Sequence, residues 1–172
     1  MLQGILVYIT GLSGSGKSTL AKMVVENLLK EFGIHAVHLD GDLLRSCISN
    51  NNYTLQGRLE MASYYVKVAK LLVDQGFIVV LSTISMFEAV RAFNRENFKN
   101  YLEVFLNVSE KIRINRDPKN FYKNNTQNMA GLNQDVELPK RSHLVYSDNF
   151  NINNACRDII EKLKEVNAKF AL

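Results

Sequence analysis

The stretch GLSGSGKST, residues 11–19, constrains the fold of this chain more than any other feature. It contains the phosphate-binding pattern G-x-x-x-x-G-K-[ST], whose defining positions are Gly11, Gly16, Lys17 and Ser18. A short apolar run at 5–9 precedes the pattern as a buried strand would, and residues 20–30 follow it with the spacing of a helix. Because the pattern requires a strand before it and a helix after it, this context disfavours the alternative of a glycine-rich turn without a ligand.

The residue types in this loop match the chemistry of nucleoside triphosphate binding. Glycines let the backbone curl so that N–H groups point at phosphate oxygens, and the start of the following helix adds its positive end. The ammonium group of Lys17 neutralises the β and γ phosphates, and the hydroxyl of Ser18 is a ligand for Mg²⁺. We therefore predict ATP and Mg²⁺ as cofactors. The predicted ATP-binding residues of the loop are Gly11, Ser13, Gly14, Ser15, Gly16, Lys17, Ser18 and Thr19.

After this loop, segments with the pattern of buried strands alternate with segments of helical spacing. Further strands are predicted at 35–39, 77–81, 102–106 and 144–146, and further helices at 59–73, 87–98, 110–116 and 159–166. A polar stretch at about 118–143 interrupts the alternation. The pattern predicts an α/β fold with a central parallel sheet, helices on both faces, and ligands at the carboxyl ends of the strands.

Length, composition and charge exclude several other classes of protein. The 172 residues, of which 47% are hydrophobic and 22% charged, suit one globular domain, 1–172. Cys47 and Cys156 form no C-x-x-C motif, so neither a disulfide framework nor a zinc site is indicated. The first apolar run reaches Gly11 too soon for a signal peptide or a membrane span, and the net charge of +4 comes without a basic block. We therefore predict a cytoplasmic protein with no membrane or nucleic-acid partner.

Two aspartates and an arginine follow the second predicted strand, in the stretch LDGDLLR at 39–45. P-loop ATPases and GTPases usually carry a metal-associated Asp after a buried strand, but the strand predicted at 77–81 ends without one. The carboxylates of Asp40 and Asp42 instead suit a small-molecule kinase. In such a site Asp42 accepts the proton of the acceptor hydroxyl or holds a water on Mg²⁺, and Arg45 binds an anionic part of the acceptor. For Asp40, a role in the site and a simple turn cap are both open.

Several motifs beyond the phosphate-binding loop occur in the order and spacing of the adenylylsulfate kinases. GLSGSGKST and DGDLLR are followed by ISMF at 84–87, NRDPKNFYK at 115–123 and GLNQDVELP at 131–139. The family pattern reads G-L-S-G-[SA]-G-K-S-T, D-G-D-N-[VI]-R, I-S-P-[FY], R-D-P-K-x-L-Y-K and G-I-D-D-P-Y-E-x-P. The chain thus resembles this family over nearly its whole length.

This resemblance implies a P-loop kinase fold with a mobile lid at roughly 118–143. It also implies a homodimer that transfers the γ-phosphoryl group of MgATP to the ribose 3′-hydroxyl of a small-molecule nucleotide acceptor. That acceptor carries a mixed anhydride on its 5′ side. The resemblance places Asp42 at the reacting hydroxyl, so that Asp42 and Lys17 are the predicted catalytic residues. The predicted metal ligands are Ser18 and Asp42.

The resemblance further assigns residues to the binding of each substrate. Arg116 is a predicted ATP-binding residue in the lid, although a solvated helix end is the alternative for both Arg116 and Lys119. The predicted acceptor-binding residues are Asp40, Arg45, Tyr53, Arg58, Met61, Ile84, Ser85, Phe87, Lys119 and Met129.

Departures from the family pattern cluster where the acceptor base would lie. Met61 stands where the family has an asparagine that can read a base edge, and Met129 where it has a phenylalanine that stacks on adenine. Met86 replaces the proline of I-S-P-[FY], and residues 133–136 replace D-D-P-Y. Each change alone is compatible with neutral drift, and Met61 with a place in the core. Together they spare the ATP site and favour a base other than adenine.

One branch of the family acts on a pyrimidine nucleotide, namely the cytidine diphosphoramidate kinases of capsule biosynthesis. Their acceptor keeps the ribose hydroxyl and the 5′ anhydride but replaces adenine with cytosine and sulfate with a phosphoramidate. We therefore expect cytidine diphosphoramidate as the acceptor, with adenosine 5′-phosphosulfate as the alternative. A nucleotide-binding switch protein is a third possibility. Such a protein would usually carry a metal-associated Asp after a buried strand or a guanine-reading N-K-x-D, and the sequence shows neither.

Overall fold

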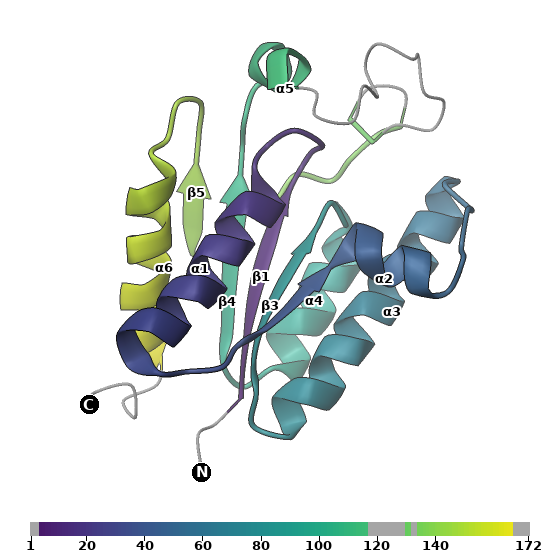
Figure 1. Ribbon diagram of the computed structural model, residues 1–172. Coiled ribbons are helices and arrows are strands. Elements are labelled where there is room, and N and C mark those ends of the chain that lie inside the picture. Colours follow the sequence, from purple (N-terminus) through teal and green to yellow (C-terminus); the bar gives the residue numbers. More distant parts are fainter. Residues whose placement is uncertain (1–3, 117–129, 132–133, 167–172) are drawn as a thin grey trace.

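A sheet of five parallel strands forms the centre of this computed structural model, which describes residues 4–116, 130–131 and 134–166. The strands are β1 (Ile5–Gly11), β2 (Val37–Asp40), β3 (Ile78–Thr83), β4 (Tyr101–Leu106) and β5 (Leu144–Tyr146). Their order across the sheet is β2-β3-β1-β4-β5, so that β1 lies in the middle (Figure 1). The helices are α1 (Lys17–Phe32), α2 (Gly41–Cys47), α3 (Leu55–Asp74), α4 (Glu88–Asn97), α5 (Glu110–Arg116) and α6 (Ile152–Val166). A helix lies between each strand and the next along the chain, as parallel pairing requires.

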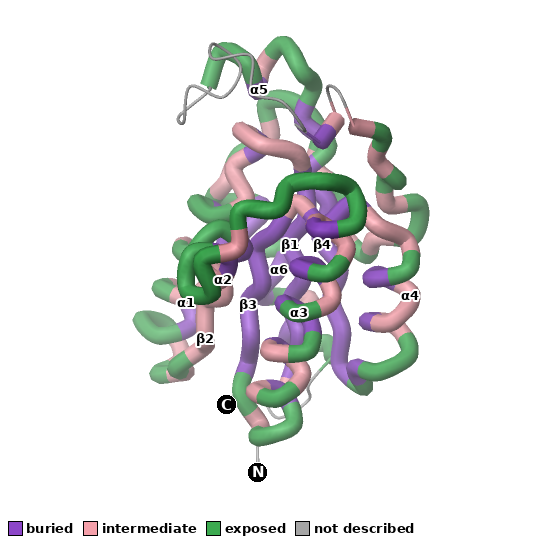
Figure 2. The backbone as a smooth tube through the Cα atoms, turned by 90° about the vertical axis from the view of Figure 1, so that its right-hand side faces the viewer, coloured by how far each residue is buried: buried purple, intermediate pink, exposed green. Residues whose placement is uncertain are grey.

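Helices cover both faces of the sheet because β1 is apolar on both of its sides. Side chains alternate between the two faces along a strand. Ile5, Val7 and Ile9 pack on the side of α1 and α6, whereas Leu6 and Tyr8 pack on the side of α3 and α4. Figure 2 shows the central strands buried and the outer surfaces of the helices exposed. The predicted α/β architecture, a parallel sheet covered on both faces, is confirmed. Within the described ranges, no helix has the length and apolarity that crossing a membrane requires.

Several elements begin or end at residues other than those predicted. α1 begins at Lys17, inside the phosphate-binding loop. α3 begins at Leu55, because the hydroxyl of Thr54 accepts a hydrogen bond from the amide of Gly57 and caps the helix. β3 continues to Thr83, so two polar residues belong to the strand itself. Sequence periodicity does not predict α2, since a helix of seven residues is too short for a repeated apolar spacing.

Most of the predicted lid at 118–143 lies outside the described residues, but its last part packs against β4 and α4. Two hydrogen bonds of 2.9 Å join His143 to Glu103: the His143 amide donates to the Glu103 carbonyl oxygen, and the Glu103 amide donates to Nδ1 of the His143 side chain. The Ser142 hydroxyl donates to the fully buried Glu103 carboxylate at 2.9 Å. The Glu137 carboxylate accepts from the first backbone amide of α4. This end of the segment is therefore anchored to the core.

Candidate active site

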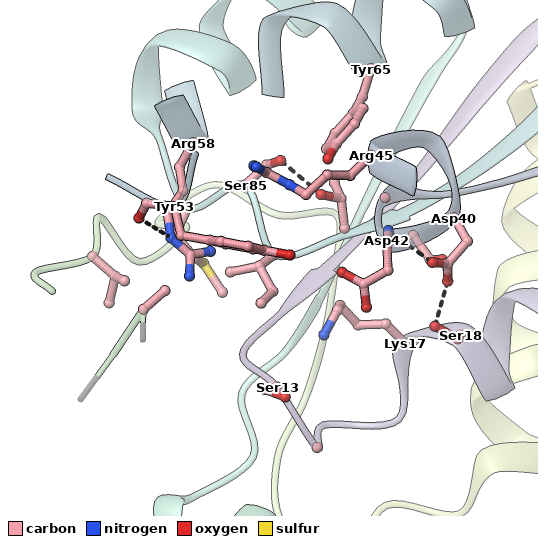
Figure 3. A pocket seen from close by; sticks show the side chains of 18 of the residues that line it. Ser13, Lys17, Ser18, Asp40, Asp42, Arg45, Tyr53, Arg58, Tyr65 and Ser85 are labelled. Atoms are coloured by element: carbon pink, nitrogen blue, oxygen red, sulfur yellow. Dashed lines mark hydrogen bonds between the residues drawn. The ribbon is translucent and has the colours of Figure 1, made fainter. Parts of the chain in front are cut away.

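A cavity of about 580 Å³ lies at the carboxyl ends of β2 and β3, beside the phosphate-binding loop. Its walls come from that loop, from α2 and α3, from the segment between β3 and α4, and from the end of α5 (Figure 3). Parallel α/β folds bind their ligands at this edge of the sheet. The volume lies in the range of sites for small molecules. The cavity is therefore the candidate active site.

Two glycines with positive φ give the phosphate-binding loop its shape. Gly16 has φ 98° and directly precedes α1, and Gly14 has φ 78°. A Cβ at Gly14 would lie 2.9 Å from the backbone oxygen of Arg113 in α5, so a larger residue would collide there. The Lys17 Nζ donates to the Leu12 carbonyl oxygen at 2.9 Å. The loop and the start of α1 border the cavity, where backbone amides can bind phosphate oxygens.

The carboxylate of Asp40 connects β2, α2, β3 and the phosphate-binding loop. Its Oδ1 accepts hydrogen bonds from the backbone amides of Asp42 (3.0 Å) and Leu43 (3.4 Å), and so caps α2. Its Oδ2 accepts from the hydroxyls of Ser18 (2.6 Å) and Ser82 (3.0 Å). Partial burial alone would raise the pKa of Asp40, but these four hydrogen bonds outweigh it and lower the pKa. The carboxylate is therefore ionised and fixed beside Ser18.

The oxygen atoms near the phosphate-binding loop suit a magnesium ion. The carboxylate of Asp42 and the ammonium of Lys17 point into the same part of the cavity, next to Asp40 and Ser18 (Figure 3). Mg²⁺ prefers oxygen ligands and is usually held by one or two protein oxygens together with substrate phosphates. The hydroxyl of Ser18 and the carboxylate of Asp42 therefore fit Mg²⁺ bound to a nucleotide. In the part of the chain that the structure describes, no group of three or more His, Cys, Asp or Glu side chains could hold a metal ion.

Two arginines and a tyrosine line the cavity on the side away from Asp40 (Figure 3). The Arg45 guanidinium lies 4.5 Å from the centre of the Tyr53 ring, and the Arg58 guanidinium lies 5.3 Å from it. Arg45 is only 7% exposed, and its Nη1 donates to the side-chain oxygen of Asn50 at 3.0 Å and to the carbonyl of Asn52 at 2.8 Å. Burial and the nearby charge of Arg45 lower the pKa of Arg58. Two positive charges held this close together favour an anionic ligand beside them.

The segment between β3 and α4, which forms one wall of the cavity, is held in place by hydrogen bonds from the central strand β1. Ser85 has φ 23°, an uncommon value for a residue other than glycine. The hydroxyl of Tyr8, fully buried in β1, donates to the Ser85 carbonyl oxygen at 3.1 Å. Burial raises the pKa of Tyr8, so this hydroxyl keeps its proton. Thr10 lies two residues after Tyr8 and therefore on the same face of β1. Its hydroxyl donates to the Ile84 carbonyl oxygen at 2.6 Å. The core therefore sets the shape of this wall.

Most residues that the sequence predicts for the site line this cavity. They are Ser13, Gly14, Gly16, Lys17, Ser18, Thr19, Asp40, Asp42, Arg45, Tyr53, Arg58, Ile84, Ser85, Phe87 and Arg116. Gly11 and Ser15 are buried instead, and a Cβ at Gly11 would lie 2.6 Å from the Ser15 hydroxyl. Met61 is 2% exposed and packs in the core between α3 and the sheet, which fits the alternative of a core residue. Lys119 and Met129 lie outside the described residues.

The cavity also contains residues that the sequence does not mark as site residues. Tyr65 follows Arg58 on α3 at a spacing that returns to the same side of a helix, and this periodicity is the one signal that could have found it. Ser82 is the next-to-last residue of β3, where a carboxylate is absent, but nothing local indicates its hydrogen bond to Asp40. Gln134, one of the departures from the family pattern at 133–136 but not among the predicted site residues, also borders the cavity, and its Nε2 donates to the Tyr53 carbonyl oxygen at 2.9 Å. Contacts between segments this far apart leave no local pattern.

Comparison with known proteins identifies the family of this chain. The family model described as adenylylsulphate kinase matches residues 3–147. A cytidine diphosphoramidate kinase of Campylobacter jejuni is 35% identical over 165 residues, which cover 94% of this chain and 92% of that protein. An adenylyl-sulfate kinase of Buchnera aphidicola is 33% identical over 168 residues, covering 94% and 81%.

A solved structure extends the likeness to three dimensions. The APS kinase of Mycobacterium tuberculosis, in complex with AMPPNP and APS, has a TM-score of 0.87 to this chain at 31% identity. The match covers 95% of this chain and 99% of that one. The family model, both relatives and this structure all describe kinases, and all cover most of the chain. The chain therefore belongs to the adenylylsulphate kinase family and is an ATP-dependent nucleotide kinase with a P-loop kinase fold.

Proposed function

We propose that this enzyme transfers the γ-phosphoryl group of MgATP to the ribose 3′-hydroxyl of cytidine diphosphoramidate. The observation that carries this choice is the likeness to the cytidine diphosphoramidate kinase of C. jejuni, which extends over 94% of this chain and 92% of that protein. Departures from the adenylylsulfate kinase pattern add support where they border the cavity, as Met86 and Gln134 do. Met61 adds little, because it lies in the core.

The cavity offers both a base and a charged group for the transfer. Asp42 accepts the proton of the ribose hydroxyl while that oxygen attacks the γ-phosphorus, and ADP leaves with the electron pair of the broken bond. Lys17 neutralises negative charge on the phosphates as the γ group moves. When bound, Mg²⁺ would be held by Ser18 and Asp42, and it would neutralise further phosphate charge. Arg116, at the end of α5, would contact the ATP.

The arginine pair would bind the 5′ anhydride of the acceptor. Arg45 and Arg58 flank the ring of Tyr53, so a negatively charged 5′ group can interact with both while the nucleotide contacts the ring. These residues suit a phosphosulfate as well as a phosphoramidate. Adenosine 5′-phosphosulfate is therefore the second candidate, favoured by the likeness to the B. aphidicola enzyme and to the M. tuberculosis structure with APS. The homodimer implied by the family resemblance stays part of this proposal.

A comparison of the two acceptors tests the proposal. Initial rates of ADP formation would be measured at saturating MgATP, and kcat/KM for cytidine diphosphoramidate should exceed that for adenosine 5′-phosphosulfate by roughly tenfold or more. ³¹P NMR should locate the new phosphate on the ribose 3′ oxygen. Without an acceptor, ATP consumption should stay at background, whereas a switch protein would hydrolyse ATP regardless. A preference for adenosine 5′-phosphosulfate would overturn the acceptor and leave the family unchanged.

A further inference from the structure

A chain of hydrogen bonds runs from the edge strand of the sheet to the phosphate-binding loop. His38 Nε2 lies 2.9 Å from the hydroxyl oxygen of Ser82. That hydroxyl donates to Asp40 Oδ2 at 3.0 Å, and the Ser18 hydroxyl donates to the same carboxylate oxygen at 2.6 Å. The strands explain this arrangement. His38 and Asp40 lie on the same face of β2 because alternate residues share a face, and Asp40 pairs in register with Ser82 of β3.

The direction of each hydrogen bond follows from the hydrogens available. A serine hydroxyl has one hydrogen, and Ser82 gives it to the Asp40 carboxylate, which can only accept. The Nε2 atom of His38 must therefore carry a hydrogen and donate it to Ser82. This holds for the neutral and the charged ring alike, because both nitrogens of an imidazolium carry hydrogen. Hydrogen bonds thus run from His38 through Ser82 to Asp40.

The same carboxylate determines which way the hydroxyl of Ser18 points. Because Ser18 donates its hydrogen to Asp40, the lone pairs of its oxygen are directed away from that carboxylate and are available to a cation. Many P-loop enzymes hold Mg²⁺ with the Ser or Thr of the loop together with an aspartate that follows a buried strand. Near the end of β3, this chain has Ser82 instead of an aspartate, and Ser82 is 2% exposed. The carboxylate is that of Asp40, which comes from the neighbouring strand β2.

We propose that Ser82 and His38 are positioning residues for phosphoryl transfer: they orient the Asp40 carboxylate so that it holds the Ser18 hydroxyl ready to bind the Mg²⁺ of the nucleotide. The inference rests on the proposed use of MgATP, but it does not depend on the identity of the acceptor. His38 acts through Ser82, and both act through Asp40. Replacing a residue that orients a metal ligand typically lowers metal affinity by about 10- to 100-fold.

Binding of Mn²⁺, followed by electron paramagnetic resonance with saturating AMPPNP, tests this role without turnover. Ser82→Ala removes the donor to Asp40 and should weaken Mn²⁺ binding about tenfold, the low end for residues that orient metal ligands. His38→Leu should weaken it less. His38→Gln, whose amide can still donate to Ser82, should retain most of the wild-type affinity. The matched control is the exposed His35, since His35→Leu removes an imidazole outside the chain of hydrogen bonds and should change nothing.

A double variant separates this chain of hydrogen bonds from a general packing effect. In the Ser82→Ala background, His38→Leu should cause no further loss of Mn²⁺ affinity, because the path to Asp40 is already broken. An equal loss in both backgrounds, or unchanged Mn²⁺ binding in folded Ser82→Ala, would overturn the proposal. In the wild type, ¹⁵N NMR should find the hydrogen of the neutral His38 ring on Nε2, and a hydrogen on Nδ1 alone would contradict it. If the wild type bound no Mn²⁺ with AMPPNP, the proposed use of MgATP would fall, and this inference with it.

Discussion

The variant Arg45→Lys keeps the positive charge at the acceptor side of the cavity and removes the planar guanidinium. That group donates to Asn50 and Asn52 and stacks on Tyr53, and a lysine ammonium cannot reproduce this geometry. Hydrogen bonds to charged groups contribute about 1.5–3 kcal/mol, and the stacked cation about 0.5–1 kcal/mol. New contacts of the lysine offset part of the loss, so we expect the free energy of unfolding to fall by about 2 kcal/mol. In a chain of this length, Tm should fall by roughly 4–8 °C.

Arg58→Lys is the matched control, because Arg58 contacts the same ring from farther away. Its Nε donates to the Tyr53 carbonyl oxygen at 3.2 Å, and the residue is less buried than Arg45. Its replacement should therefore lower Tm less than Arg45→Lys does. Both variants should raise the KM for the acceptor and leave the KM for ATP unchanged. Thermal unfolding followed by circular dichroism, with steady-state rates, measures both effects. An unchanged Tm in Arg45→Lys would refute the idea that the loop at Asn50 and Asn52 holds the guanidinium.

Four further predictions concern other parts of the site. Lys17→Ala should reduce transfer to background while the circular dichroism spectrum stays native, since it removes about 3 kcal/mol or more of transition-state stabilisation; wild-type turnover would contradict this. Asp42→Asn should lower kcat by about 100-fold or more with little change in acceptor KM, and a full kcat in steady-state rates would exclude Asp42 as the base. Tyr8→Phe leaves the Ser85 carbonyl without its buried donor, so the free energy of unfolding should fall by about 1–2 kcal/mol and the acceptor KM should rise. Denaturant unfolding and kinetics check both, and an unchanged KM would separate this wall from acceptor binding. Burial raises the pKa of Cys156 to about 11, whereas Cys47 is exposed. A thiol reagent at pH 8 should therefore label Cys47 alone in the native protein and both cysteines after unfolding, and rapid native labelling of Cys156 would show that α6 is not packed as described.

The sequence predicts those parts of the fold that depend on local patterns. α5 and β5 have the predicted bounds, 110–116 and 144–146. The phosphate-binding loop lies between the predicted strand and helix because its glycines determine the backbone there. Buried strands of a parallel sheet are continuous apolar runs, so a short window of sequence is enough to find them.

The rest depends on contacts between distant segments. Asp40 shows this most clearly, since its partners Ser18 and Ser82 come from other elements and only the folded sheet brings them together. Met61 shows the second limit. Comparison with the family pattern places it at the acceptor base, but it also fits the apolar face of α3, and in the structure it lies with that face in the core. Where the two interpretations conflicted, helical periodicity was the better guide to burial.

The placement of Asp40, Asp42 and Arg45 on one short segment means that the two halves of the cavity are not mechanically independent. Asp40 accepts a hydrogen bond from Ser18, and the guanidinium of Arg45 lies over the ring of Tyr53. A small tilt of α2 toward an acceptor would therefore also shift the carboxylate beside the nucleotide phosphates. Thermodynamic linkage requires any such effect to be mutual, so that a molecule occupying one half changes the affinity of the other half for its own ligand by the same factor. If α2 tilts in this way, an inhibitor that occupies one half of the cavity would differ in potency according to whether the substrate of the other half is already bound.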